Sequence, residues 1–167
     1  MAEAFNDLIL PAEKAQRYAA VAEEIAAVLD GEPNLTARMA TVASMLASTF
    51  DHYFWTGFYV VDETREAELV VGPYQGTLGC MRIAFGRGVC GTAAATGQTQ
   101  VVEDVHAFPG HIACDGRSAS EIVAPVFDPD GKLIAVFDVD SDRPAAFDGV
   151  DKDGLEGILK QVFAARR

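Results

Sequence analysis

Residues 121–141 read EIVAPVFDPDGKLIAVFDVDS, and this stretch decides the fold. Two apolar runs, Glu121 to Phe127 and Lys132 to Asp140, flank the sequence Asp128-Pro129-Asp130-Gly131. Proline, aspartate and glycine between two short apolar runs predict a β-hairpin. Because a hairpin joins antiparallel neighbours, we expect this pair to lie in an antiparallel sheet.

Three carboxylates interrupt the apolar hairpin. Glu121 opens its first strand, and Asp138 and Asp140 stand near the end of its second. Side chains on a strand alternate with a period of two, so Asp138 and Asp140 share one face. If the strands pair through the turn, Glu121 lands near them and the three could converge. Such a cluster can bind an ammonium group, and repulsion would keep one member protonated. An ordinary strand end facing water explains the same residues about equally well.

Further strands are predicted before the hairpin. Tyr53 to Asp62 and Ala67 to Val71 are aromatic and β-branched, and the polar Asp62 to Arg65 between them indicates a turn. Gly72 to Gly76 would end the second of these strands. In the first, we assign Phe58 to the core, whereas Trp55 and Tyr59 have the same parity and could wall a small apolar pocket.

Helices are predicted at both ends of the chain. Ala12 to Leu29 carries an apolar face, Asn34 caps a second helix that reaches Phe50, and Asp148 to Ala164 is amphipathic. A short helix opens at Cys90 and closes at Gly97, between short strands at Arg82 to Phe85 and Thr99 to Val102. The 167 residues fit one α+β domain, an antiparallel sheet with helices packed on its faces.

Composition excludes several classes of partner. The formal net charge is −12, and no basic cluster is present to bind nucleic acid or anionic membranes. Met1 to Pro11 lacks the basic and apolar regions of a secretory signal. The longest apolar run, within Val89 to Ala95, is too short to span a membrane. We therefore expect a soluble cytoplasmic protein.

The chain has three cysteines, and an odd number fits poorly with a secreted disulfide framework. Cys80 lies in a glycine-rich connection, and Cys114 lies in the long polar segment Asp104 to Ser120, which has no periodicity. A loop of that length is usually functional. Loop cysteines in a reducing compartment suit a nucleophile with a resolving partner, since a sulfenic acid condenses with a nearby thiol. Which of the three meet in space is left open by their spacing.

The surroundings of the cysteines predict different reactivities. The N–H groups at the start of the short helix would lower the pKa of Cys90, although a small buried residue in a tight turn fits that position better. His106 and His111 could lower the pKa of Cys114. A zinc site of three thiolates and a histidine is a weaker alternative, because the cysteines are never paired as C-x-x-C. We expect no metal and no cofactor.

Several segments together resemble one family. Gly86 to Ala94, Asp104 to Asp115 and Ser120 to Val123 resemble the free methionine-(R)-sulfoxide reductases, which are GAF-domain enzymes. Trp55 to Tyr59 and Gly72 to Gly76 match the same family. The resemblance covers nearly the whole chain, and its most specific parts are the His-Ile-Ala-Cys-Asp loop and the three cysteine positions.

The resemblance implies a fold and a function. It implies a single GAF domain over residues 1–167 with a six-stranded antiparallel sheet, a homodimer, and reduction of free methionine-(R)-sulfoxide with thioredoxin as the reductant. Cys114 would be the nucleophile, Cys80 the resolving thiol and Cys90 an alternative resolver. The substrate would be bound by Glu121, Asp138 and Asp140, which also assist proton transfer, and by Trp55 and Tyr59.

Two features depart from the family pattern, and one of them is the hairpin around Asp62 to Glu68, which is longer than is typical. Gly116-Arg117 follows Asp115 where small residues are usual, so Arg117 adds a charge near the proposed nucleophile.

A GAF module that only senses a small ligand is the alternative function. It would have no need of three cysteines, and it predicts ligand binding without turnover.

Overall fold

A six-stranded sheet with the order β3-β2-β1-β6-β5-β4 forms the centre of the protein in a computed structural model that describes residues 9–165. The strands are β1 (Trp55–Val61), β2 (Glu68–Gln75), β3 (Arg82–Ala84), β4 (Gln100–Val102), β5 (Ser120–Phe127) and β6 (Leu133–Ser141). Every neighbouring pair is antiparallel, as predicted. The β5–β6 hairpin contains residues 121–141, and β6 lies between β5 and β1.

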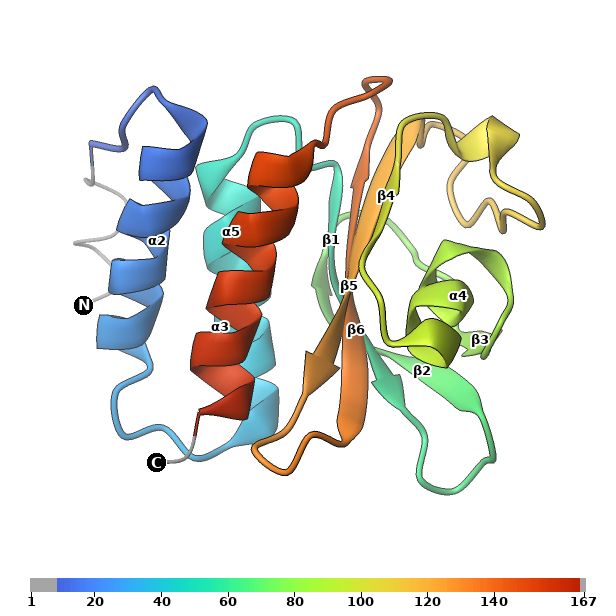
Figure 1. Cartoon of the computed structure of the whole chain (residues 1–167), viewed down its shortest axis with the longest axis horizontal. Helices are drawn as coiled ribbons and strands as arrows, with labels where there is room; N and C mark the ends of the chain where they lie inside the picture. The colour runs from blue at the N-terminus through green and yellow to red at the C-terminus, as the bar shows by residue number, and fades with distance from the viewer. Residues whose placement is uncertain (1–8, 166–167) are drawn as a thin grey trace.

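Helices cover the two faces of the sheet unequally (Figure 1). On one face lie α2 (Lys14–Val28), α3 (Leu35–Thr49) and α5 (Gly149–Leu159), the last continued by the π-helical turn η2 (Lys160–Ala164). On the other lie α4 (Gly88–Thr96) and the 3₁₀ turn η1 (Val105–Ala107). The α+β architecture predicted from the sequence is confirmed.

Alternation along the central strands separates two cores. Phe58, Ile122 and Phe137 point toward the three long helices. Their neighbours Tyr59, Val123 and Val136 point toward α4. Both sets are buried, so the period of two is hidden in a nearly continuous apolar sequence.

Capping residues set the helix ends where the sequence predicted them. The Asn34 side chain accepts a hydrogen bond from the backbone N–H of Ala37 at the start of α3. Asp148 forms a capping box with Asp151 at the start of α5. Gly97 ends α4 with φ of +65°, a left-handed conformation that favours glycine.

Several element boundaries differ from the prediction by a few residues, and two of these differences lie beside candidate site residues. α4 begins at Gly88 rather than Cys90, so Cys90 is its third residue. β2 does not end at Gly72 but continues to Gln75. Its register with β1 shifts between Gly57 and Tyr59, so Phe58 faces two residues of β2 in a bulge. A bulge accommodates Pro73, which has no N–H to donate to the ladder.

Some predictions concern residues near the termini. Most of the segment Met1 to Pro11, for which no secretory signal was predicted, lies outside the described residues. Within residues 9–165, no helix has both the length and the apolar character that crossing a membrane requires.

Candidate active site

A disulfide joins Cys80 to Cys114 across 34 positions of sequence, with their Cα atoms 5.3 Å apart. Cys80 lies in the connection between β2 and β3, and Cys114 lies in the loop that follows η1. Cys80 is partly buried against the apolar core on the α4 face, whereas Cys114 is exposed. The structure thus resolves which cysteines meet, and Cys90 stays a free buried thiol.

A pocket opens beside this disulfide on the α4 face of the sheet. Its walls combine aromatic side chains, carboxylates, the start of α4 and the loop that carries Cys114. The lining residues are Trp55, Tyr59, Leu78, Gly79, Ile83, Arg87, Gly88, Val89, Cys90, His111, Ile112, Cys114, Asp115, Ser118, Glu121, Asp138 and Asp140. All eight residues proposed from the sequence belong to this pocket except Cys80, which is bonded to a member of it.

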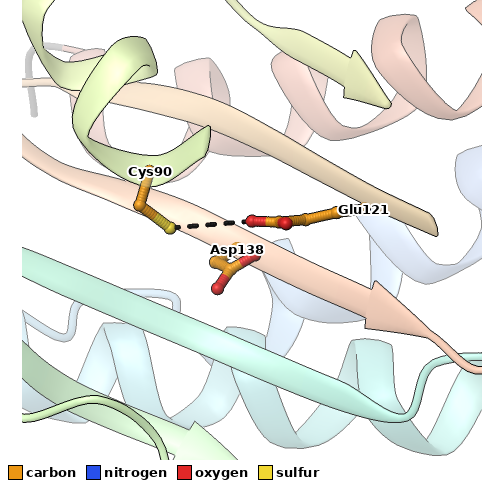
Figure 2. A group of neighbouring side chains, drawn as sticks. All are labelled: Cys90, Glu121 and Asp138. Atoms are coloured by element: carbon orange, nitrogen blue, oxygen red, sulfur yellow. Dashed lines mark hydrogen bonds between the residues drawn. The ribbon is translucent and has the colours of Figure 1, made fainter. Parts of the chain in front are cut away.

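Strand register brings the three carboxylates together. Glu121 on β5 pairs with Asp140 on β6, and Asp138 is on the same face of β6 as Asp140. The side chains of Glu121 and Asp138 converge below α4 (Figure 2). Each of these two residues is only 5% exposed. The predicted convergence is therefore observed, and the alternative of a strand end facing water does not fit Glu121 and Asp138.

Burial raises the pKa of all three carboxyl groups, and repulsion by neighbouring members of the cluster adds to the rise at Glu121 and Asp138. Desolvation is the main cause at Glu121, followed by the charges of Asp138 and Asp140. At Asp138 the pKa is raised by desolvation and then by Asp140. Asp140 is partly exposed, accepts a hydrogen bond from Ser118, and has its pKa raised by burial to about 6. Glu121 and Asp138 therefore hold a proton more tightly than ordinary carboxyl groups do, while Asp140 is mostly ionised at neutral pH.

One oxygen of this cluster has no protein partner. The Oδ1 atom of Asp138 is buried, and no described residue forms a hydrogen bond with it. An unsatisfied buried oxygen is costly, and native proteins keep few of them. The atom lines the pocket and is available to a bound ligand.

Cys90 lies directly against the carboxylates. Its Sγ is 4.0 Å from Oε1 of Glu121 (Figure 2). The pKa of Cys90 is raised, first by burial and then by Asp138 and Glu121. The expected lowering by the helix start is wrong, because desolvation and two neighbouring acids outweigh the partial charge of a short helix. The interpretation of Cys90 as a small buried residue is the one that fits.

His111 contacts the same cluster. Its Nε2 atom is 3.7 Å from Oε2 of Glu121. Burial and then the nearby His106 lower the pKa of His111, and burial raises the pKa of Glu121, so burial disfavours the charged form of both groups in this contact. A thiol in a disulfide does not titrate, so the effect of these histidines on Cys114 stays a prediction.

The aromatic wall of the pocket is a stack. The Trp55 ring lies 5.5 Å from that of Tyr59 and 5.0 Å from that of Tyr74, with nearly parallel planes. The Nε1 of Trp55 donates to the carbonyl of Thr77 at 2.9 Å. Phe58 points to the other face and packs on Phe137, as predicted. The sequence did not indicate Tyr74 as part of this stack.

A second set of polar contacts holds the Cys114 loop. Asp115 accepts hydrogen bonds from Oγ1 of Thr77 at 2.8 Å and from Nη2 of Arg117 at 2.8 Å. The Arg117 guanidinium also lies 4.5 Å from the centre of the Phe54 ring. We call Phe54, Thr77, Asp115 and Arg117 the loop clamp. Arg117 is paired rather than a free charge beside Cys114, and it holds the pKa of Asp115 well below its usual range.

Sequence reasoning missed Thr77 and Ser118 in this site. Neither residue belongs to a repeating pattern, and both act through partners far away in the chain. No local signal could have found them.

The observed geometry also tests the alternative of a metal site. A zinc site with three thiolates does not match, because two of the three are joined in the disulfide. Donor atoms of Cys90, Glu121 and Asp138 lie within 4.8 Å of one another, so these three could hold an ion. Their raised pKa values mean that protons would have to leave first, which opposes metal binding at neutral pH.

Comparison with known proteins shows which family this chain belongs to and which proteins it is similar to. A GAF domain family model matches residues 35–165. The chain is 43% identical over 137 residues to the free methionine-R-sulfoxide reductase of Saccharomyces cerevisiae, covering 80% of this chain and 76% of that protein. It is 40% identical over 149 residues to the enzyme of the same name from Escherichia coli, covering 89% and 88%.

A solved structure extends the similarity to three dimensions. The free methionine-R-sulfoxide reductase of Neisseria meningitidis, determined in complex with its substrate, superposes with a TM-score of 0.87. It is 47% identical, and the match covers 93% of this chain and 92% of that one.

Proposed function

This chain belongs to the GAF-domain family of free methionine-R-sulfoxide reductases, and we propose that it reduces free methionine-R-sulfoxide to methionine. The observation that carries the proposal is a disulfide between two loop cysteines at the edge of a pocket lined by buried carboxyl groups with raised pKa values. A cysteine that can form a disulfide, a proton donor and an apolar wall are what sulfoxide reduction needs.

The pocket chemistry suggests how the substrate binds. Asp140, mostly ionised at neutral pH, would bind the substrate ammonium group. The stacked rings of Trp55 and Tyr59 would hold the methyl sulfoxide end. Backbone N–H groups at the start of α4 would receive the carboxylate, because Arg87 makes no side-chain cap there. Recognition of both charged ends would exclude methionine sulfoxide within a polypeptide, where neither group is free.

The reaction would begin with attack of the Cys114 thiolate on the sulfoxide sulfur. The Glu121–Asp138 pair, whose pKa values are raised by burial, would donate a proton to the sulfoxide oxygen. The oxygen passes to Cys114, which becomes a sulfenic acid, and methionine leaves. The Cys80 thiol then condenses with the sulfenic acid, releasing water and forming the disulfide. Cys90 would be an alternative resolver, although its raised pKa disfavours that role.

The resemblance adds proposals about partners and place. We infer that thioredoxin returns the disulfide to two thiols and that the enzyme works as a homodimer. A cycle that consumes thiol reductant suits the cytoplasm. We also infer that residues 1–167 form one GAF domain. In support, α2 lies before the matched range but is bonded to α5 through Tyr18 and Asp151.

Turnover of the free amino acid tests the proposal directly. Reduction of free methionine-R-sulfoxide is measured with thioredoxin and its reductase, for wild type and for Cys114→Ser. We expect the variant to lose about 1,000-fold or more of the activity, because serine is a far weaker nucleophile. Full activity in the variant would exclude Cys114 as the attacking group.

A blocked substrate tests the specificity. N-acetyl methionine-R-sulfoxide amide lacks both charged ends, and we expect little or no turnover of it. Equal rates on the blocked and free sulfoxides would contradict the proposed recognition of both ends. Tight binding of the free sulfoxide without any turnover would instead support the ligand-sensing GAF module.

A further inference from the structure

Exposed apolar side chains gather around the disulfide. Seven large apolar residues are exposed in residues 9–165, and three of them lie within two positions of Cys80 or Cys114. These are Leu78, Met81 and Ile112, at 77%, 62% and 37% exposure. Soluble proteins expose single apolar side chains freely, but a group of them at a reactive bond indicates a contact surface. We call these three residues the apolar rim.

The disulfide brings the two segments of the rim together. Leu78 and Ile112 stand at the same pocket as Cys114. Met81 directly follows Cys80, and its backbone carbonyl accepts a hydrogen bond from Val71 at 3.0 Å, which ties this segment to the sheet. Among the neighbouring charges, Asp115 pairs with Arg117, and Arg82, which follows Met81, pairs with Asp62 and Glu68. In a chain of net charge −12, the three side chains of this patch are apolar.

We propose that the apolar rim is the docking surface for the protein dithiol that reduces the Cys80–Cys114 disulfide, and that this dithiol attacks Cys114. The proposal rests on the proposed function, which closes the disulfide in every turnover. A small thiol needs only the sulfur atoms. The exposed rim on both sides of the bond offers affinity only to a partner with its own apolar surface around a reactive thiol.

Access selects the sulfur that is attacked. Cys114 is exposed, whereas Cys80 is partly buried against the core that includes Trp55 and Tyr59. Attack by the partner's thiolate on Sγ of Cys114 breaks the Cys80–Cys114 bond and forms a mixed disulfide, and Cys80 leaves as a thiolate and takes up a proton. The partner's second thiol then attacks the partner's own sulfur atom in the mixed disulfide. Cys114 is released, the partner becomes a disulfide, and two electrons have passed to the enzyme.

Reduction of the oxidised enzyme, without any sulfoxide, tests the docking surface. The rate of disulfide opening is followed with thioredoxin and, separately, with dithiothreitol. For Met81→Gln we expect the second-order rate with thioredoxin to fall about five- to tenfold and the rate with dithiothreitol to stay unchanged. Leu35→Gln is the matched control, because Leu35 is 39% exposed at the start of α3 on the other face, and it should change neither rate.

Three results would overturn the docking surface. They are an unchanged thioredoxin rate in Met81→Gln, an equal loss in Leu35→Gln, and an equal loss with both reductants. None of these results depends on sulfoxide turnover. Failure of the proposed function would appear separately, as absence of methionine formation with dithiothreitol in the wild type.

A trapped intermediate tests the direction of attack. Oxidised wild-type enzyme is mixed with a thioredoxin variant that keeps only its attacking cysteine, and the mixed disulfide is digested and located by mass spectrometry. We expect the thioredoxin peptide on Cys114. Finding it on Cys80 would contradict the attack assigned here.

Discussion

The two faces of the sheet treat buried carboxyl groups in opposite ways. On the face covered by α2, α3 and α5, Asp151 is fully buried, accepts a hydrogen bond from the hydroxyl of Tyr18 at 2.8 Å and pairs with Nζ of Lys14 at 2.8 Å. On the α4 face, Asp138 is as well hidden, but one of its oxygens has no partner and its pKa is raised.

This difference separates a structural carboxylate from one kept for chemistry. A satisfied buried ion pair locks helices together, whereas an unsatisfied acid costs stability and persists where a ligand uses it. The apolar core beneath the three long helices supplies the stability that lets the α4 face hold Cys90, Glu121 and Asp138 together. Four predictions test this contrast. Two compare Asp→Asn substitutions on opposite faces of the sheet, and two have smaller expected effects.

The largest effect is expected from Asp138→Asn. Loss of a general acid typically costs about 10²–10⁴-fold in rate, so kcat for free methionine-R-sulfoxide should fall by that factor. The amide has the shape of the protonated carboxyl group, and the free energy of unfolding should fall little. Steady-state kinetics and urea unfolding measure the two quantities. A variant with wild-type kcat, or one that loses activity only because it unfolds, would remove the distinction between the faces.

Asp151→Asn should show the reverse pattern. The change leaves Lys14 and Tyr18 with a weaker partner in a buried site, and hydrogen bonds to charged groups contribute about 1.5–3 kcal/mol. We expect a loss of that size in the free energy of unfolding, with kcat and KM unchanged under conditions where the protein is folded. Chemical denaturation and the turnover assay give the comparison, and a large drop in kcat would show that the helix face also contributes to catalysis.

The pH dependence of stability should isolate Asp140. Its pKa is about 6 in the folded protein and starts from 3.8, so the folded state binds the proton more tightly. The stabilising effect of that proton is complete below about pH 4 and is lost as the pH rises toward about 6. The wild type should therefore lose stability relative to Asp140→Asn between these values and run parallel to it above them. Urea unfolding of both proteins from pH 4 to pH 7 tests this, and a constant difference would rule it out.

The smallest effect is expected at the loop clamp. The clamp bridges the segments of Thr77 and Asp115, which are also the segments that the disulfide joins. Arg117→Ala should make the disulfide about two- to fivefold easier to reduce, the scale of an exposed ion pair. The equilibrium with a dithiothreitol redox buffer measures this. Arg65→Ala is the control, because Arg65 is similarly exposed and pairs with Glu68 far from the loop. Equal shifts in both variants would show that the clamp has no specific role.

Short-range patterns explain why much of the architecture was predictable. The Asp128 to Gly131 turn sets the β5–β6 register, and the period of two then brings Glu121 near Asp138 and Asp140. Asn34 and Asp148 mark helix starts by bonding to backbone within a few residues. Each of these interactions lies within one element or between direct neighbours.

Other features depend on residues far apart in the chain. The extension of β2 to Gln75 follows from its pairing with β1, and the loop clamp joins residues 38 positions apart. The pKa of Cys90 rises because β5 and β6 pack acids against it and exclude water. Spacing does not report burial, so the local effect of the helix start predicted the wrong direction.

By itself, then, the sequence determined the hairpin, the helix ends, the shared face of the carboxylates and, through resemblance, the family. Three features emerged from tertiary packing alone: Cys80 meets Cys114, Cys90 is a buried thiol with a raised pKa, and exposed apolar residues flank the disulfide cysteines. The physical reason is the separation along the chain of the residues that interact. Turns, caps and alternation are set by neighbours in the chain, whereas contact between loops, burial and the pKa values that follow exist only once distant segments have packed.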